Sequence, residues 1–332
     1  MIKIVPLLFL TACLSFKVSA QTTYAEKLGF PKGAKVLILH VDDAGMSYES
    51  NQGAIDALTK GVATSTSVMM PCGWVPGFVH WLKENPAVDA GLHLTLTSEW
   101  KDYRWGPLSG KPAVPGLTDA EGALWPTVED VVKNATADEV YSEIKAQLER
   151  AKTMGFDPTH LDSHMGTLFA TPSFMEEYLR LGIENKIPVM LPAGAGEVIK
   201  QQMHLDETYM QQIRLLGKKL WEAGLPVLDD LYNETYEWKI PQEIQNDDAQ
   251  VDAYKTKKYI AALKKLKPGA TMMIMHCTIG SDIFGQISDS GPLRKGDLFA
   301  MMNPAFKEAL QNEGIVLTTW RELMQRRMKA GD

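Results

Sequence analysis

The chain has 332 residues, of which 45% are hydrophobic and 23% charged, and its formal net charge is −7. This composition is typical of globular proteins and argues against disorder, and a chain of this length can bury a core without disulfide staples. The excess of acidic residues argues against a nucleic-acid partner, because such proteins neutralise phosphates with clustered Lys and Arg.

The first twenty residues have the order of an export signal. A basic Lys3 precedes the apolar residues 4–10, and the small residues 18–20 end the segment as a signal peptidase requires. The apolar stretch is too short to span a membrane, and no later segment of the sequence is long and uncharged enough to do so. We therefore expect an exported protein, periplasmic or secreted, with a single domain over residues 21–332.

A second interpretation of the same segment is lipidation. Residues 10–13 resemble a bacterial lipobox in which Cys13 becomes the lipidated first residue, although cleavage after Ala20 is favoured. With cleavage after Ala20 two cysteines remain, Cys72 and Cys277. They could pair in an oxidising compartment, but we favour two separate buried thiols. No zinc-finger spacing of Cys and His occurs in the sequence.

Apolar runs and helical patterns then alternate along the chain, which is typical of α/β architecture. Residues 35–41 form a nearly continuous apolar run, as expected of a strand buried on both faces. Ser47 stands where an N-cap would, ahead of a helical pattern over 51–58 that Gly61 ends. The other predicted strands cover 65–70, 89–97, 159–164, 188–191, 226–231, 271–276 and 315–320. The other predicted helices cover 76–83, 136–154, 173–184, 206–222, 251–266 and 304–312.

Seven or eight strands with intervening helices predict an α/β fold, a distorted TIM-like (β/α) barrel of about seven strands. A doubly wound open sheet is the alternative. Residues 98–126 and 232–249 lack clear periodicity, and loops of this length usually carry function.

Polar clusters stand near the carboxyl ends of the predicted strands, where parallel α/β proteins carry their chemistry. Asp42 and Asp43 directly follow the strand over 35–41. Taken alone, such a pair is more often a turn or a helix cap than a site. His93, inside the strand over 89–97, would on its own usually be a satisfied core or edge residue.

The third cluster lies on one predicted strand. The side-chain period of two places His160, Asp162 and His164 on the same face. Three polar groups on one face are hard to bury without partners, so a site is as well supported as a structural role. Within such a triplet one residue can bind a metal while a neighbour orients it, and we expect Asp162 or His160 to orient His164 or its surroundings.

Together the clusters offer one carboxylate and two imidazoles from different strand ends, namely Asp43, His93 and His164. This donor set suits Zn²⁺ or another divalent transition ion, with positions left open for water and substrate. Whether the native ion is zinc or magnesium stays open. Asp42 would then lie beside the ion as a general base for a water molecule.

Short segments along the chain also match, in order, the motifs of one family. They are DDAG at 42–45, NQGAI at 51–55, GVATSTS at 61–67, GLHLTLT at 91–97, THLDSH at 159–164, MIMH at 273–276 and GIVL at 314–317. In these segments the chain resembles the YdjC/ChbG-like carbohydrate deacetylases, and the likeness runs from about residue 36 to residue 324.

The resemblance implies a seven-stranded distorted (β/α) barrel of the glycoside hydrolase/deacetylase type that removes N-acetyl groups from sugars with a divalent metal. It implies that Asp43, His93 and His164 are the metal ligands. It further implies that Asp42 is the catalytic base and that His276 is the general acid.

The sequence departs from the family pattern at three places. Ala44 replaces an aromatic residue, residues 165–167 replace further histidines, and Cys277-Thr278 replaces Pro-Gly. None of these departures removes a predicted ligand, but they leave the substrate pocket and the role of His276 open.

The sequence thus predicts an exported hydrolase that acts on an acetylated saccharide. An O-deacetylase and a glycan-binding protein on a deacetylase scaffold are the alternatives, and the complete ligand set favours an enzyme. Trp100, Tyr103 and Trp105 are the predicted sugar-stacking side chains, although some of these rings are expected only to anchor the loop. The sugar, the native metal and a possible dimer stay open.

Overall fold

The structure, a computed structural model, describes residues 22–331. The predicted export signal, with Cys13, lies outside the described residues. The seven strands of the sheet are all parallel, and six of them follow the order β4-β3-β2-β1-β6-β5 while β7 pairs with β1. The strands are β1 (Lys35–Ala44), β2 (Ser65–Val68), β3 (Ala90–Leu94), β4 (Leu161–Ser163), β5 (Asp230–Tyr232), β6 (Gly269–Met275) and β7 (Val316–Leu317).

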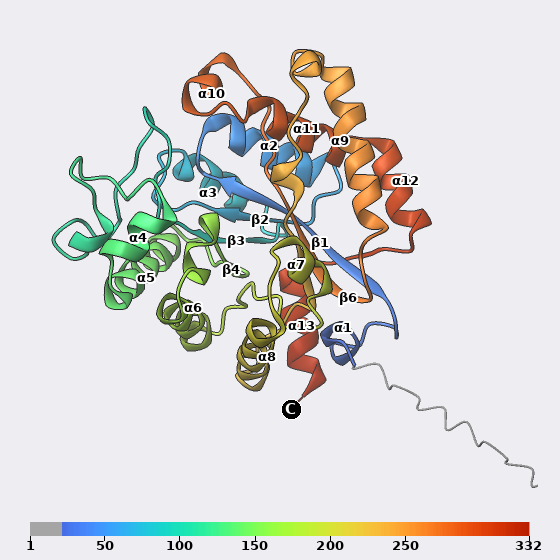
Figure 1. The fold of residues 1–332 in the computed structure, drawn as a ribbon, viewed down its shortest axis with the longest axis horizontal. Coiled ribbons are helices and arrows are strands. Elements are labelled where there is room, and N and C mark those ends of the chain that lie inside the picture. Colours follow the sequence, from blue (N-terminus) through green and yellow to red (C-terminus); the bar gives the residue numbers. More distant parts are fainter. Residues whose placement is uncertain (1–21, 332) are drawn as a thin grey trace, which may run out of the picture.

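Helices surround this sheet on its outer side (Figure 1). They are α1 (Tyr24–Lys27), α2 (Tyr48–Thr59), α3 (Val75–Glu84), α4 (Val128–Asn134), α5 (Ala137–Thr153), α6 (Pro172–Asn185), α7 (Glu197–Gln202), α8 (Glu207–Glu222), α9 (Asp248–Leu263), α10 (Asp282–Ile287), α11 (Gly291–Met302), α12 (Pro304–Asn312) and α13 (Trp320–Ala330). Short 3₁₀ turns are η1 (Pro115–Leu117), η2 (His164–Phe169), η3 (Thr235–Glu237) and η4 (Gln242–Ile244). Among the helices of this described part, none is long and apolar enough to cross a membrane.

Single bridges close the sheet between its two outer strands. Leu161 of β4 pairs with Val189, and Pro192 pairs with Leu228, just before β5. The strand predicted over 188–191 is therefore wrong as a strand, although the segment lies where that strand would. Pro192 has no N–H to donate, so no regular ladder continues there. The result is the expected distorted (β/α) barrel.

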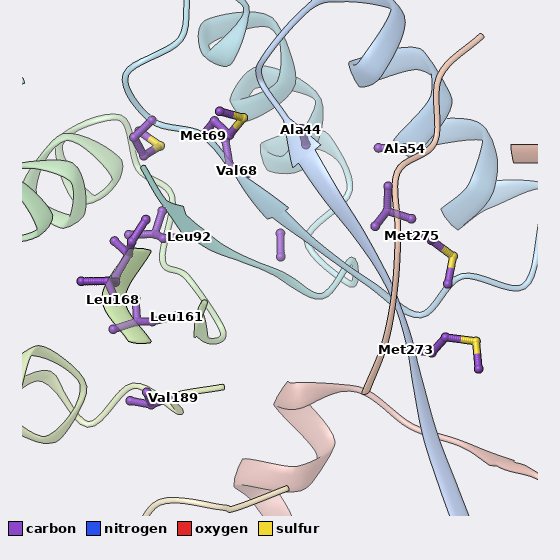
Figure 2. Packing of buried hydrophobic residues seen from close by; sticks show 14 of the residues in the cluster. Ala44, Ala54, Val68, Met69, Leu92, Leu161, Leu168, Val189, Met273 and Met275 are labelled. Atoms are coloured by element: carbon purple, nitrogen blue, oxygen red, sulfur yellow. The ribbon is translucent and has the colours of Figure 1, made fainter. Parts of the chain in front are cut away.

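The central strand β1 explains how the barrel holds together. Every residue of β1 after Lys35 is buried, and β6 pairs with it from Gly269 to Met275. Burial on both faces matches the apolar run in the sequence. Apolar side chains from neighbouring strands pack into the same core (Figure 2).

Local signals at the end of β1 also behave as the sequence predicts. The Ser47 hydroxyl accepts a hydrogen bond from the Ser50 N–H and so caps α2, which runs from Tyr48 to Thr59. Cys72 and Cys277 are buried free thiols, as expected. The capped start of α2 thus fixes the turn that follows Asp42 and Asp43 at the carboxyl end of β1.

Candidate active site

A backbone irregularity places both carboxylates of the Asp42-Asp43 pair at one cavity. The register of β1 against β2 shifts between Val41 and Ala44, and Asp43 has a positive φ of 66°. This bulge breaks the alternation of side chains along the strand, so both residues line the cavity. A non-glycine residue in this conformation is strained, and such strain is concentrated at functional sites.

The three predicted ligands converge at this point. His93 comes from β3, and His164 begins η2 directly after β4. Asp43 Oδ1 lies 3.3 Å from His93 Nε2 and 3.4 Å from His164 Nδ1. All three side chains are buried and line a cavity of about 650 Å³.

A carboxylate holds the remaining nitrogen of each imidazole. His93 donates through Nδ1 to Asp162 Oδ1 at 2.7 Å, and His164 Nε2 lies 3.1 Å from Glu99 Oε1. The sequence pattern predicts that Asp162 or His160 orients His164 or its surroundings. In the structure Asp162 instead contacts His93, His160 Nε2 lies 3.6 Å from Asp162 Oδ2, and Glu99 is the partner of His164. Such partners fix the orientation of a ligating histidine and leave its other nitrogen free to coordinate.

The surplus of negative charge makes this an attractive place for a cation. Burial alone would raise the pKa of Asp43, but the Arg294 guanidinium, whose Nη1 lies 2.6 Å from Asp43 Oδ2, and two histidines hold it well below its usual range. Burial lowers the pKa of His164, but Glu99 and Asp43 outweigh it and raise that pKa to about 9. The imidazole therefore gains a positive charge readily, and a bound cation can supply that charge instead.

Three groups of side chains among residues 22–331 bring at least three donor atoms close together. One is Asp43, His93 and His164, and the other two both contain Asp162. His40, His160 and Asp162 form one of these groups and none of them lines the cavity, whereas Asp43, His93 and His164 all line it, where a bound ion can also meet water or substrate.

The group formed by Asp43, His93 and His164 fits a divalent ion. Asp43 Oδ1 is buried and accepts a hydrogen bond from none of the described residues, while nitrogens of both histidines face it. One carboxylate and two imidazoles that border a cavity are a donor set for zinc or a similar divalent ion. These three residues could therefore hold a metal.

His276 reaches the same cavity from the end of β6. Its Nε2 lies 3.9 Å from Asp42 Oδ2 and 4.0 Å from Asp43 Oδ2. Burial and then the neighbouring Arg294 lower the pKa of His276. Asp42 and His276 thus form a carboxylate–imidazole pair beside the three convergent donors.

A buried ion pair fixes the backbone that carries His276. The His276 N–H donates to Asp297 Oδ2 at 3.1 Å, and the same carboxylate lies 2.6 Å from Lys255 Nζ. Tyr259 donates its hydroxyl to Asp297 Oδ1 at 2.7 Å. Lys255 and Asp297 are both fully buried, so water cannot stabilise either charge when the other is removed.

Replacement of Lys255 by Met is expected to lower the free energy of unfolding by about 3–5 kcal/mol, because it leaves the Asp297 carboxylate buried without its cation. Urea unfolding measures the loss. The matched control is Lys257→Met, an exposed position on the same helix, for which we expect a change within about 0.5 kcal/mol. Equal stability of the two variants would contradict a structural role for the pair.

The three aromatic side chains predicted to stack on sugars occupy different positions. Trp100 lines the cavity. Tyr103 donates its hydroxyl to the Met46 carbonyl, and Trp105 donates through Nε1 to the Thr97 carbonyl at 2.9 Å. Tyr103 and Trp105 therefore anchor the loop outside the cavity lining, which leaves Trp100 as the ring placed to meet a ligand.

Comparison with known proteins places this architecture in a family. The model of the family described as YdjC-like protein matches residues 36–312. The chain belongs to the YdjC-like family. A relative from Thermus thermophilus, named carbohydrate deacetylase, is 30% identical over 300 residues, which cover 90% of this chain and 97% of that protein.

Other YdjC-like relatives match over shorter stretches. A protein from Yersinia enterocolitica, named chitooligosaccharide deacetylase, is 33% identical over 135 residues, or 39% of this chain and 49% of that protein. A solved structure from Enterococcus faecalis, of a candidate cellobiose-phosphate cleavage protein, superposes with a TM-score of 0.70 at 21% identity. It covers 87% of this chain and 99% of that one, which supports the barrel fold.

Sequence reasoning misses three residues of this YdjC-like site. His40 Nε2 lies 3.2 Å from Asp42 Oδ1 and 2.9 Å from Asp162 Oδ2, and a strand period of two already places His40 on the face of Asp42. Glu99 stands just beyond the GLHLTLT segment and could have been found there. Arg294 lies 251 positions from Asp43, and no local pattern marks it.

Proposed function

We propose that this protein is an exported, metal-dependent carbohydrate deacetylase that hydrolyses the acetamide group of N-acetylated saccharides. The observation that carries the proposal is the meeting of Asp43, His93 and His164 in a cavity that Asp42 and His276 also line. Two relatives named as carbohydrate and chitooligosaccharide deacetylases support the substrate class. The composition of residues 1–20 supports export.

Asp43, His93 and His164 would hold the ion. When bound there, a divalent ion lowers the pKa of water and polarises a carbonyl oxygen. Asp42, which lines the cavity beside them, accepts the proton of the attacking water. The water oxygen adds to the acetyl carbon, the C–N bond breaks, and acetate and a free amine leave.

We assign to His276 the transfer of the proton that Asp42 takes to the leaving group. His276 Nε2 lies 3.9 Å from Asp42 Oδ2, and its lowered pKa leaves the imidazole neutral and able to receive that proton. His276 then delivers the proton to the departing amine, as a general acid. Arg294 keeps the Asp43 carboxylate ionised throughout.

The test is product release from a panel of acetylated saccharides. N-acetylglucosamine oligomers and O-acetylated xylan oligomers are incubated with the metal-loaded protein, and acetate and free amine are both measured. We expect acetate and amine in equal amounts from the N-acetylated members. Acetate without amine, from the O-acetylated members alone, would instead identify an O-deacetylase, and no acetate from any member would leave only a binding role.

Replacement of Asp162 by Asn is expected to weaken metal binding about 10–100-fold, the usual cost of losing the partner that orients a ligating histidine. Asn has the same shape, but its amide oxygen carries no formal charge, so the hydrogen bond that it accepts from His93 Nδ1 is weaker. Calorimetric titration with Zn²⁺ measures the affinity. An unchanged dissociation constant would show that Asp162 does not prepare His93 for a metal.

A further inference from the structure

The cavity at the proposed active site has two chemically different halves. The polar half is lined by side chains that hydrogen-bond or carry charge, including Asn233, Tyr236, Glu237 and Arg294. The other half is formed by residues between 165 and 213, from η2 and the residue after it, the closing segment 188–192, α7, α8 and the segment that joins these two helices. Among the described residues that line this second half, none is charged.

The apolar half continues the protein core. Ile199 belongs to the same buried cluster as Met190, and Ile213 belongs to the larger core cluster. Met203 and Met165 also line the cavity and are 54% and 50% exposed. Both are large apolar side chains that stay partly exposed at the edge of the cavity, and burial of such surface against a ligand is favourable.

A saccharide is poorly suited to this half. A buried hydroxyl without a hydrogen-bond partner costs free energy, and the lining between Met165 and Ile213 offers chiefly thioether and aliphatic groups. The cavity volume of about 650 Å³ is typical of sites for ligands far larger than an acetyl group. This part of the lining therefore suits a hydrocarbon chain better than a sugar.

The two halves meet at the three convergent donors. Arg294 and His276 contact Asp43 from the polar side. Met165 directly follows His164, and it begins the apolar side. A scissile amide has the same order, with a sugar on its nitrogen and an acyl chain on its carbonyl carbon.

We propose that the same centre prefers, over N-acetyl substrates, N-acylated amino sugars whose acyl chain is longer than acetyl, with the sugar in the polar half and the chain against Ile199, Met203 and Ile213. This inference rests on the proposed function, since it requires the amide to be hydrolysed at the same centre. The reaction is unchanged in its balance: water supplies the oxygen, the C–N bond breaks, and a fatty acid and a free amino sugar leave.

A chain-length series tests the inference on the metal-loaded protein. The substrates are N-acetyl-, N-butanoyl-, N-hexanoyl- and N-octanoylglucosamine, and released amine is measured. Because each methylene removed from water contributes a fairly constant free energy, we expect kcat/KM to rise roughly two- to fourfold per methylene until the apolar half is filled. A steady fall from acetyl to octanoyl would overturn the chain-length inference and leave deacetylation standing, whereas no amine from any member would overturn both.

A binding measurement separates recognition from turnover. The slow variant Asp42→Asn, loaded with Zn²⁺, is titrated with the same four amides in a calorimeter. We expect the dissociation constant to fall with chain length by a similar factor per methylene. Equal dissociation constants across the series would contradict an acyl site.

A pair of matched substitutions locates the chain in the cavity. Met203→Glu puts a charge into the apolar wall at a half-exposed position, and Met328→Glu makes the same change on α13, where Met328 is 65% exposed and outside the cavity lining. We expect Met203→Glu to lower the ratio of octanoyl to acetyl kcat/KM at least tenfold, and Met328→Glu to leave that ratio unchanged. An equal ratio in both variants would place the chain elsewhere.

Discussion

Replacement of Asp42 by Asn is expected to lower kcat by about 10²–10⁴-fold, the usual contribution of a general base, while the protein keeps its metal. Asp42 lines the cavity, and its Oδ2 lies 3.8 Å from His93 Nε2, farther than the Oδ1 of Asp43. The amide has the shape of the carboxylate but cannot accept the proton of water. Steady-state amine release, together with metal content after dialysis, measures both effects.

The matched control is Asp56→Asn. Asp56 pairs with Lys60 on the surface of α2 and does not line the cavity, so we expect kcat unchanged. If Asp42→Asn turned over as fast as this control, the assignment of Asp42 as the base would be wrong.

Replacement of Asp43 by Asn is expected to weaken metal binding and to lower activity with it. The loss of affinity should exceed the factor of about 10–100 that the loss of an orienting partner costs. Asn tolerates the left-handed backbone better than Ala, so this substitution respects the φ of 66° at this position. It removes the anionic donor and leaves Arg294 opposite a neutral group.

Calorimetric titration with Zn²⁺ gives the affinity, and activity is followed in the same samples. The Asp42→Asn protein is the control, since it should bind one equivalent. Full metal content in the Asp43→Asn protein after dialysis would exclude Asp43 as a ligand.

The sequence predicts the barrel because its strands carry strong local signals. The run over 35–41 is apolar enough to identify β1, and Ser47 identifies the start of α2. The end of β1 at Ala44 could not be read in the same way, since the bulge at Asp43 depends on the register with β2. The sequence predicts a strand over 188–191 because local propensity cannot show that this segment makes only two single bridges, at Val189 and Pro192, in place of a regular ladder.

The candidate site divides along a similar line. Asp43, His93 and His164 were predictable because parallel strands bring their carboxyl ends to one edge. Arg294 and the apolar half of the cavity were not, because α7 and α11 carry no pattern that points to a distant strand end. Tyr103 and Trp105 are predicted as sugar contacts but anchor the loop instead. Aromatic content alone does not distinguish a ligand contact from a loop anchor.

Metal stoichiometry tests the central claim most directly. The protein is stripped with a chelator, Zn²⁺ or Mg²⁺ is added back in steps, and amine release from an N-acylated glucosamine is followed at each step. We predict no turnover in the stripped protein and a rise that ends at one equivalent of ion per chain. Full turnover by the stripped protein would contradict the role given to Asp43, His93 and His164.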